Sequence, residues 1–263
     1  MNSHPAMMST GGRVSSTPLT LEVIGGVATI TLGSGLRHNV LEPRDWDDLA
    51  SIADTVAARF DVKVVVIRGG GKTFSAGSNL RSWDEADAHT VDEGFLRIEA
   101  ALQAIESIPV PTLAVVEGVA AGAGCELALA CDLRLFTESA SIGLPILQLG
   151  VLVSPHFALR LTALVGVARS RELLYSGRLV LAEEAEKLGL ANSVVPQDGI
   201  DAEILRWVGE ISRQPRLGLV AAKSASSRAL LELRRQHDAP GWTFSDPGVF
   251  PRRIREFFAR RTR

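Results

Sequence analysis

The sequence has few cysteines, little net charge and no long apolar segment, and each shortage excludes a class of protein. Two of its 263 residues are cysteine, too few for a disulfide framework, so a reduced intracellular protein is expected. The formal net charge of −2 provides no attraction for nucleic acid. The chain lacks the roughly 18 consecutive apolar residues of a membrane helix, so we expect no association with a membrane.

The usual motifs for metals, nucleotides and export are also missing. There is no His-Glu-x-x-His or paired Cys-x-x-Cys motif, so no metal site is expected. Gly70–Thr73 lacks the earlier glycine of a phosphate loop, and Gly122–Gly124 lacks the third glycine of a dinucleotide fingerprint. Residues 1–17 are rich in Ser, Thr and Gly, without the apolar run of a secretory signal. We interpret them as a flexible tail and expect a cytoplasmic protein.

What remains is an ordinary globular composition, 46% hydrophobic and 22% charged. Runs rich in β-branched residues alternate with segments of helical periodicity, which predicts an α/β core followed by a helical C-terminal part. A hairpin is expected around Gly25–Gly26, because two glycines suit a two-residue turn. The runs Lys63–Arg68 and Thr112–Val116 are predicted to be strands buried on both faces, and Asp132–Phe136 a short strand.

Helices are predicted from apolar residues at helical spacing and from the positions of proline. Pro43 suits the first turn of a helix that continues to Val56, and Gly118–Gly124 is expected to be a loop. The other expected helices are Val91–Ser107, Cys125–Ala130, His156–Leu164, Arg169–Tyr175, Ala182–Leu188, Ile200–Arg213, Leu217–Leu233 and Arg252–Arg261.

Two loops of small residues share a design that suits a ligand oxygen. The strand Lys63–Arg68 is followed by FSAGSNL at residues 74–80, and Thr112–Val116 is followed by GVAAGAGCEL from Gly118. Small residues let a backbone approach a ligand closely, and free N–H groups at a helix start carry a partial positive charge. Two such groups on one carbonyl oxygen form an oxyanion hole. On the residues alone, tight packing before a helix is the alternative interpretation.

These loops and two further segments resemble the signatures of the enoyl-CoA hydratase/isomerase (crotonase) family. FSAGSNL is similar to F-x-A-G-x-D-L, and GVAAGAGCELALACDLRL to G-x-x-x-G-G-G-x-E-L-x-x-x-C-D. SGRLVLAEEAEKLGLANSVVP is similar to the family's S-G-x-x-x-x-A-x-E-A-x-x-x-G-L-V-x-x-V-V-P. VATITL followed by Arg37-His38-Asn39 resembles the opening strand and the Lys/Arg-x-Asn signature. The matches occur in the family's order, from about Leu21 to the C-terminus.

The resemblance implies a crotonase-like spiral of repeated ββα units over residues 18–198. It also implies a helical C-terminal region, residues 199–263, that assembles a homotrimer or a dimer of trimers. The substrate would be an acyl-CoA, with no cofactor beyond its coenzyme A moiety and no metal. The basic C-terminal helix, with Arg260 and Arg261, resembles the part that lies near a neighbouring subunit's coenzyme. A solvated helix face is the alternative for these arginines.

Carried over by position, the oxyanion donors are the backbone N–H groups of Ser78 and Ala123, and Arg37 contacts the coenzyme A nucleotide. The residues that the resemblance places around the coenzyme A thioester are Arg37, Ala76, Ser78, Asn79, Leu80 and Ala123. The residues expected in the substrate pocket are Trp83, Ile146, Val153 and His156.

Glu126 matches one of the two glutamates that hydratases of this family use as acid and base. It follows the oxyanion loop by one helical turn, which places it beside the thioester. We expect the helix dipole to lower its pKa and to favour a base over an acid. The alternative is a carboxylate that only satisfies the start of the helix.

The second hydratase glutamate is replaced. The family's P-E-x-x-x-G segment reads Pro145-Ile146-Leu147-Gln148-Leu149-Gly150 here, and isoleucine cannot transfer a proton. Hydration needs water activated on one side and a proton delivered to carbon, so ordinary hydratase activity is expected to be weak. His156 is a candidate replacement acid, and Asn79, where the family has Asp, is interpreted as a structural change in the loop.

Several functions remain open at this point. The first is enolate chemistry on an acyl-CoA, by hydration, by double-bond isomerisation, or by decarboxylation of a malonyl-type thioester or C–C cleavage. Family decarboxylases also tend to lack the second glutamate. The second is a catalytically silent acyl-CoA-binding protein. The third is a serine hydrolase that uses Ser78 or Ser154 with His156, although Ser154 is better explained as a helix cap.

Overall fold

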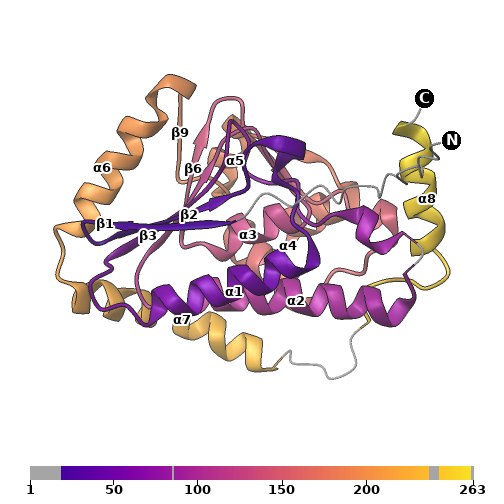
Figure 1. Ribbon diagram of the computed structural model, residues 1–263, viewed down its shortest axis with the longest axis horizontal. Helices are drawn as coiled ribbons and strands as arrows, with labels where there is room; N and C mark the ends of the chain where they lie inside the picture. The colour runs from indigo at the N-terminus through magenta and orange to yellow at the C-terminus, as the bar shows by residue number, and fades with distance from the viewer. Residues whose placement is uncertain (1–18, 85, 237–242, 262–263) are drawn as a thin grey trace, which may run out of the picture.

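The computed structural model describes residues 19–84, 86–236 and 243–261 (Figure 1). The predicted flexible tail, residues 1–17, lies outside the described residues. Within them the chain forms a mixed α/β fold with two sheets and a helical C-terminal part, as the sequence predicts.

The larger sheet has six strands in the order β1-β2-β3-β4-β6-β9. Its first two strands form the predicted antiparallel hairpin, and each later neighbour in the sheet pairs in parallel. The strands are β1 Thr20–Ile24, β2 Val27–Leu32, β3 Val64–Gly69, β4 Thr112–Val116, β6 Leu133–Thr137 and β9 Ser193–Val195.

The run of apolar residues in β3 is continuous because helices cover both faces of the sheet. Val65 and Ile67 belong to the main core, beneath α1 (Pro43–Ala57) and α2 (Ala88–Ser107), whereas Val66 belongs to a second core beneath α6 (Ile200–Ser212). Successive strand residues point to opposite faces, so both alternating sets must be apolar. In Figure 1, α1 and α2 run together along one side of the sheet and α6 stands at its end.

The smaller sheet was not predicted. It contains β5 Val119–Ala121, β7 Ser141–Gly143 and β8 Leu179–Leu181 in the order β5-β7-β8. The loop expected over Gly118–Gly124 therefore includes a strand. Each of these strands has three residues and pairs with a partner distant in sequence, so no local periodicity reveals it.

The remaining helices mostly match the predicted ranges. The two helices expected at His156–Leu164 and Arg169–Tyr175 are one element, α4 Pro155–Ser176, with a break at Gly166 where φ is 74°. Ser154 caps this helix by accepting a hydrogen bond from Phe157 N, which confirms its interpretation as a cap. The other helices are α3 Ala123–Ala130, α5 Ala182–Leu188, α7 Arg216–Gln236 and α8 Phe250–Arg261.

Candidate active site

The two small-residue loops predicted from the sequence are joined directly to one another. Ser75 N donates to Val119 O and Ala121 N donates to Ser75 O, both at 3.0 Å. Gly124 fits against Ser75 so closely that an added Cβ would lie 2.2 Å from Ser75 O. These contacts place the segment after β3 alongside β5 and the start of α3.

Ser78 and Ala123 lie on the two facing segments, and both residues line the same cavity. Gly77, with φ at 88°, packs against the start of α3, where an added Cβ would stand 2.7 Å from Ala123 N. The neighbouring amides are engaged: Asn79 N donates to Leu41 O, and Gly122 N to Gly143 O. Within the described part of the chain, neither Ser78 N nor Ala123 N has a hydrogen-bond acceptor. Both amides can therefore donate a hydrogen bond to a ligand.

A left-handed turn over residues 37–39 borders the cavity, to which Arg37 and His38 contribute lining side chains. Arg37, His38 and Asn39 have φ values of 53°, 56° and 50°, a conformation that few residues other than glycine adopt and that Asn tolerates best. The Asn39 side chain holds the turn in place. Its Oδ1 accepts from Gly35 N, and its Nδ2 lies 2.9 to 3.0 Å from the carbonyl oxygens of Gly70, Thr73 and Phe74. The sequence contained Asn39 within a signature but gave no sign of this role.

The cavity has a volume of about 520 Å³ and brings together most of the predicted site residues. The predicted residues that line it are Arg37, Ala76, Ser78, Asn79, Leu80, Trp83, Ala123, Glu126 and Ile146. Lining residues that sequence reasoning did not assign to the site include His38, Arg81, Ile98, Gln148, Leu149, Phe257 and Phe258.

Val153 and His156, predicted in the substrate pocket, do not line this cavity. Val153 packs against the main hydrophobic core, and His156 belongs to the first turn of α4, which the Ser154 cap starts. Ser78, unlike His156, lines the cavity, and its hydroxyl accepts a hydrogen bond from Trp46 Nε1 at 2.8 Å.

Glu126 carries the only carboxyl group among the described residues that line the cavity. Burial raises its pKa from 4.5 to about 8, with a further rise from Glu99 and a smaller lowering by Arg160. The expectation that the helix dipole would lower this pKa is wrong, because the loss of hydration outweighs the favourable field of the helix start. At neutral pH most Glu126 side chains hold a proton.

Ile146 stands where the family's second glutamate is expected, beside the turn that begins α3. Its Cγ2 lies 4.0 Å from the position that a Cβ on Gly122 would take. An apolar side chain therefore borders the cavity next to Ala123. No other carboxyl group among the described lining residues replaces the missing acid.

Asn79 has a structural partner that explains its identity. Its Nδ2 donates to Glu42 Oε1 at 2.7 Å, and its Oδ1 accepts from Arg81 N at 3.1 Å. Ser82 Oγ donates to the other oxygen of Glu42. An aspartate at position 79 would place a second negative charge against Glu42, so the amide fits where the family pattern has an acid.

Aromatic side chains close one part of the cavity. Trp83 stacks on Phe95 with ring centroids 4.9 Å apart, and Phe95 stacks on Phe244 at 5.6 Å. Helix α8 adds Phe257 and Phe258, and the guanidinium of Arg81 lies 4.5 Å from the Phe258 ring centroid. The C-terminal helix thus packs on the cavity of its own chain. Arg260 is exposed on that helix, and the Arg261 side chain lies outside the described residues.

No group of three or more His, Cys, Asp or Glu side chains suited to a metal occurs in the described ranges. None of the described helices is both long and apolar enough to cross a membrane.

Comparison with known proteins gives consistent matches. The family model described as Enoyl-CoA hydratase/isomerase matches residues 22–240. The probable enoyl-CoA hydratase echA8 of Mycobacterium bovis is 34% identical over 206 residues, which are 77% of this chain and 78% of that protein. The enoyl-CoA isomerase/hydratase fer4 of Mycosarcoma maydis is 35% identical over 191 residues, covering 70% of this chain and 68% of its own. A crystal structure of an enoyl-CoA hydratase from Mycobacterium avium subsp. paratuberculosis covers 94% of this chain and 97% of its own, with a TM-score of 0.81 and 28% identity.

Proposed function

This chain belongs to the enoyl-CoA hydratase/isomerase family, and we propose that it isomerises the double bond of an enoyl-CoA through a bound thioester enolate. The enolate oxygen would accept hydrogen bonds from Ser78 N and Ala123 N. Glu126 would carry the proton. The observation that supports this most directly is that Glu126, the one carboxyl group among the described lining residues, shares the cavity with Ser78 and Ala123, whose amides have no protein acceptor there.

The reaction balances with one acid–base group. The Glu126 carboxylate takes a proton from the α-carbon of a 3-enoyl thioester, and the electron pair moves onto the thioester oxygen as the enolate forms. The protonated Glu126 then returns the proton to the γ-carbon, which leaves the 2-enoyl thioester and a carboxylate as at the start. Each oxyanion donor of this kind contributes about 2.7–4 kcal/mol of transition-state stabilisation.

Hydration fits the cavity less well. Water addition requires one group to activate water and another to protonate carbon, and Ile146 replaces the second carboxyl group. We therefore expect 2-enoyl-CoA hydration to be slow compared with isomerisation.

Decarboxylation of a malonyl-type thioester is the second candidate, and the protonation state of Glu126 favours it. With a pKa of about 8, Glu126 is mostly neutral at pH 7, so it would not repel a substrate carboxylate. Loss of carbon dioxide leaves the electron pair as an enolate, and the Glu126 proton then goes to the α-carbon. Here the protonated form is required at the start, in contrast to isomerisation.

The coenzyme A end of the substrate is assigned to the exposed rim of the cavity. Arg37 and Arg81 line the cavity and are exposed to solvent, which suits contact with nucleotide phosphates. Ala76, Asn79 and Leu80 would border the thioester arm. Three expectations from the sequence stay predictions. They are assembly through residues 199–263 as a homotrimer or a dimer of trimers, a cytoplasmic location, and the absence of any cofactor beyond coenzyme A.

The test compares wild-type protein with Glu126→Gln on 3-enoyl-CoA, 2-enoyl-CoA and malonyl-CoA, with Glu183→Gln as an exposed control. General acid–base catalysis contributes about 10²–10⁴-fold, so Glu126→Gln should lose at least 100-fold in kcat on the true substrate. The control should keep wild-type activity. An unchanged kcat in Glu126→Gln would rule out the carboxyl role.

Two other outcomes separate the remaining functions. If no thioester is converted by the wild-type protein but acyl-CoA still binds, the protein is a binding module. If a serine-directed covalent reagent labels Ser78 or Ser154 and abolishes turnover, the protein is a hydrolase. The pH profile distinguishes the two enolate reactions, since isomerisation rises with pH through about 8 and decarboxylation falls.

A further inference from the structure

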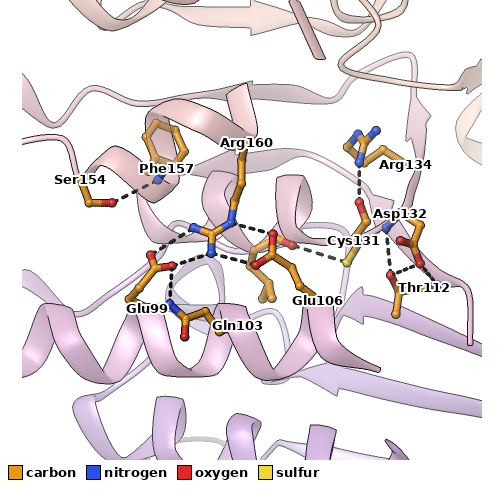
Figure 2. A network of polar contacts seen from close by, with 11 residues as sticks. Glu99, Gln103, Glu106, Thr112, Cys131, Asp132, Arg134, Ser154, Phe157 and Arg160 are labelled. Atoms are coloured by element: carbon orange, nitrogen blue, oxygen red, sulfur yellow. Dashed lines mark hydrogen bonds and ion pairs between the residues drawn. The ribbon is translucent and has the colours of Figure 1, made fainter. Parts of the chain in front are cut away.

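A buried ion cluster joins the two helices, α2 and α4, that pack against the helix carrying Glu126. Arg160 of α4, whose side chain is 2% exposed, is held between Glu99 and Glu106 of α2. Its Nη1 and Nη2 donate to the two oxygens of Glu99 at 3.1 and 2.6 Å. Its Nε and Nη2 donate to the two oxygens of Glu106 at 2.9 and 3.0 Å. Figure 2 shows the guanidinium lying between the two carboxylates, with Gln103 beside Glu99.

The cluster carries one excess negative charge. One guanidinium faces two carboxylates, so Arg160 cannot cancel both of them. Buried ionised groups are costly unless they are paired, and an arrangement with a single carboxylate would be balanced. Because Arg160 also pairs with Glu106, its positive charge compensates the negative charge of Glu99 only in part.

Helix α3 brings Glu126 against this cluster. It packs on both α2 and α4, the helices that supply Glu99 and Arg160. Ile98, the residue before Glu99, lines the same cavity as Glu126. Glu99 itself does not line the cavity and is 8% exposed. It therefore acts on Glu126 through its charge and not by contact with a substrate.

We propose that Glu99, held by Arg160 and Glu106, is a positioning residue whose buried charge opposes a second negative charge on Glu126 and makes the Glu126 carboxylate a stronger proton acceptor. This inference rests on the proposed function, in which Glu126 moves the proton. Its chemistry is electrostatic, because Glu99 exchanges no proton with the substrate.

The electrostatics of the site agree with this role. Burial is the first cause that raises the pKa of Glu126 to about 8, Glu99 is the second, and Arg160 opposes them. From the helices packed on α3, Glu99 and Arg160 are the charged groups that act on Glu126, and Cys125 is its neighbour on α3 itself. The other titratable groups of the cavity, Arg37, His38 and Arg81, are exposed to solvent, which screens them.

The arrangement is useful for a base that works alone. The effectiveness of a general base follows its basicity, and a catalytic pKa near the operating pH gives the best combination of strength and ionised fraction. A glutamate at its ordinary pKa would be ionised but weak. A buried neighbouring carboxylate corrects this without placing a second acid in the cavity.

The experiment measures the pH dependence of kcat and KM for isomerisation in wild-type protein, Glu99→Gln and Glu106→Gln. Glu184→Gln is the matched control, because Glu184 and Glu172 hold Arg178 in the same way at an accessible position. In Glu99→Gln the rise of kcat near pH 8 should move to a lower pH by about one unit or more. The plateau value of kcat should fall, and KM should stay unchanged. Glu106→Gln should move this rise in the same direction by less, and Glu184→Gln should leave it in place.

A readout that needs no turnover separates this inference from the proposed function. The infrared carbonyl band of protonated Glu126 is identified as the band lost in Glu126→Gln, and its titration is followed in each variant. A band that titrates at the same pH in Glu99→Gln and wild-type protein overturns the inference, even if isomerisation is confirmed. A band that titrates at lower pH in Glu99→Gln than in wild-type protein supports the inference, even if the substrate proves different. Loss of kcat with its rise near pH 8 unmoved would mean that Glu99 is only structural.

Discussion

Gly77 packs against the backbone of Ala123, with no room for a methyl group between them: an added Cβ would lie 2.7 Å from Ala123 N and 2.8 Å from Ala121 O. The residue after Gly77 supplies one proposed oxyanion donor, and Ala123 supplies the other. The distance between the two amides therefore depends on the absence of a side chain at position 77.

We expect Gly77→Ala to separate the two amides and to lower kcat by about 100-fold, the usual effect of losing one oxyanion donor. The substitution is also strained at a φ of 88°, so stability should fall by more than about 1 kcal/mol. Gly25→Ala is the control, because Gly25 also has positive φ but has nothing within 4 Å of an added Cβ. Gly25→Ala should lose stability but keep the wild-type kcat. Equal kcat in all three proteins would contradict the proposed geometry.

Asn39→Asp should destabilise the protein strongly while leaving the left-handed turn sterically possible. The amide Nδ2 of Asn39 faces three backbone carbonyl oxygens, and a carboxylate oxygen there would meet three acceptors. The loss of a buried donor and the charge repulsion should cost about 3 kcal/mol or more. Urea unfolding measures the change.

Asn192→Asp is the matched control for this substitution. Asn192 uses its Oδ1 to accept from Arg134 N at 2.8 Å, a contact that a carboxylate oxygen can keep. Its free energy of unfolding should change by less than about 1 kcal/mol. A similar loss in both variants would show that the amide donor of Asn39 is not the cause.

Trp83→Ala should enlarge the cavity and shift the substrate preference toward longer acyl chains. Trp83 is 5% exposed and stacks on Phe95, so its removal opens space next to the proposed acyl group. The ratio of kcat/KM for long and short enoyl-CoA esters should rise. The cost in stability should be about 3–5 kcal/mol. Trp207 lies on α6 and packs, partly buried, against the second core. Trp207→Ala should leave the chain-length ratio unchanged, and a rise in this ratio in Trp207→Ala would contradict the assignment of Trp83 to the acyl pocket.

Glu126 should make the protein less stable as the pH rises. Its pKa is about 8 in the folded protein against an ordinary 4.5. The folded state therefore keeps a proton that the unfolded chain releases. The contribution is fully favourable below about pH 4.5 and is lost as the pH rises through about 8, with a slope of at most about 1.4 kcal/mol per pH unit.

Urea unfolding of wild-type protein and Glu126→Gln at pH 5, 6, 7 and 8 measures this effect. The difference in free energy of unfolding should move in favour of the glutamine variant as the pH rises. Glu183→Gln, which removes an exposed carboxylate paired with Lys187, should show no such trend. Parallel curves for Glu126→Gln and wild-type protein would mean that the pKa of Glu126 is not raised.

Local patterns in the sequence determined much of the larger sheet and nearly all of the helices. The β-branched run around Val65 predicted a strand covered on both faces because both of its faces must be apolar. Pro43 predicted a helix start because its missing N–H has no partner there in any case. The order of Ser78, Ala123 and Glu126 along the chain, in motifs resembling a known family, was enough to place them at one site.

Tertiary structure alone decided the rest. Strands β5, β7 and β8 are too short to show a period, and they exist because distant segments pair. Val153 and His156 belong to the altered stretch of sequence, yet Val153 packs against the main core and His156 lies in the first turn of α4, so neither lines the cavity. Helix α8 contributes Phe257 and Phe258 to that lining from the far end of the chain.

The charge state of Glu126 shows most clearly why the sequence alone could not predict these features. The sequence places this carboxyl in the first turn of a helix, where a lowered pKa is the natural expectation. Its actual environment depends on burial and on Glu99, which lies on another helix and is 27 positions earlier in the chain. Hydration and through-space charge depend on what surrounds a group in three dimensions, so no local pattern of residues could have supplied them.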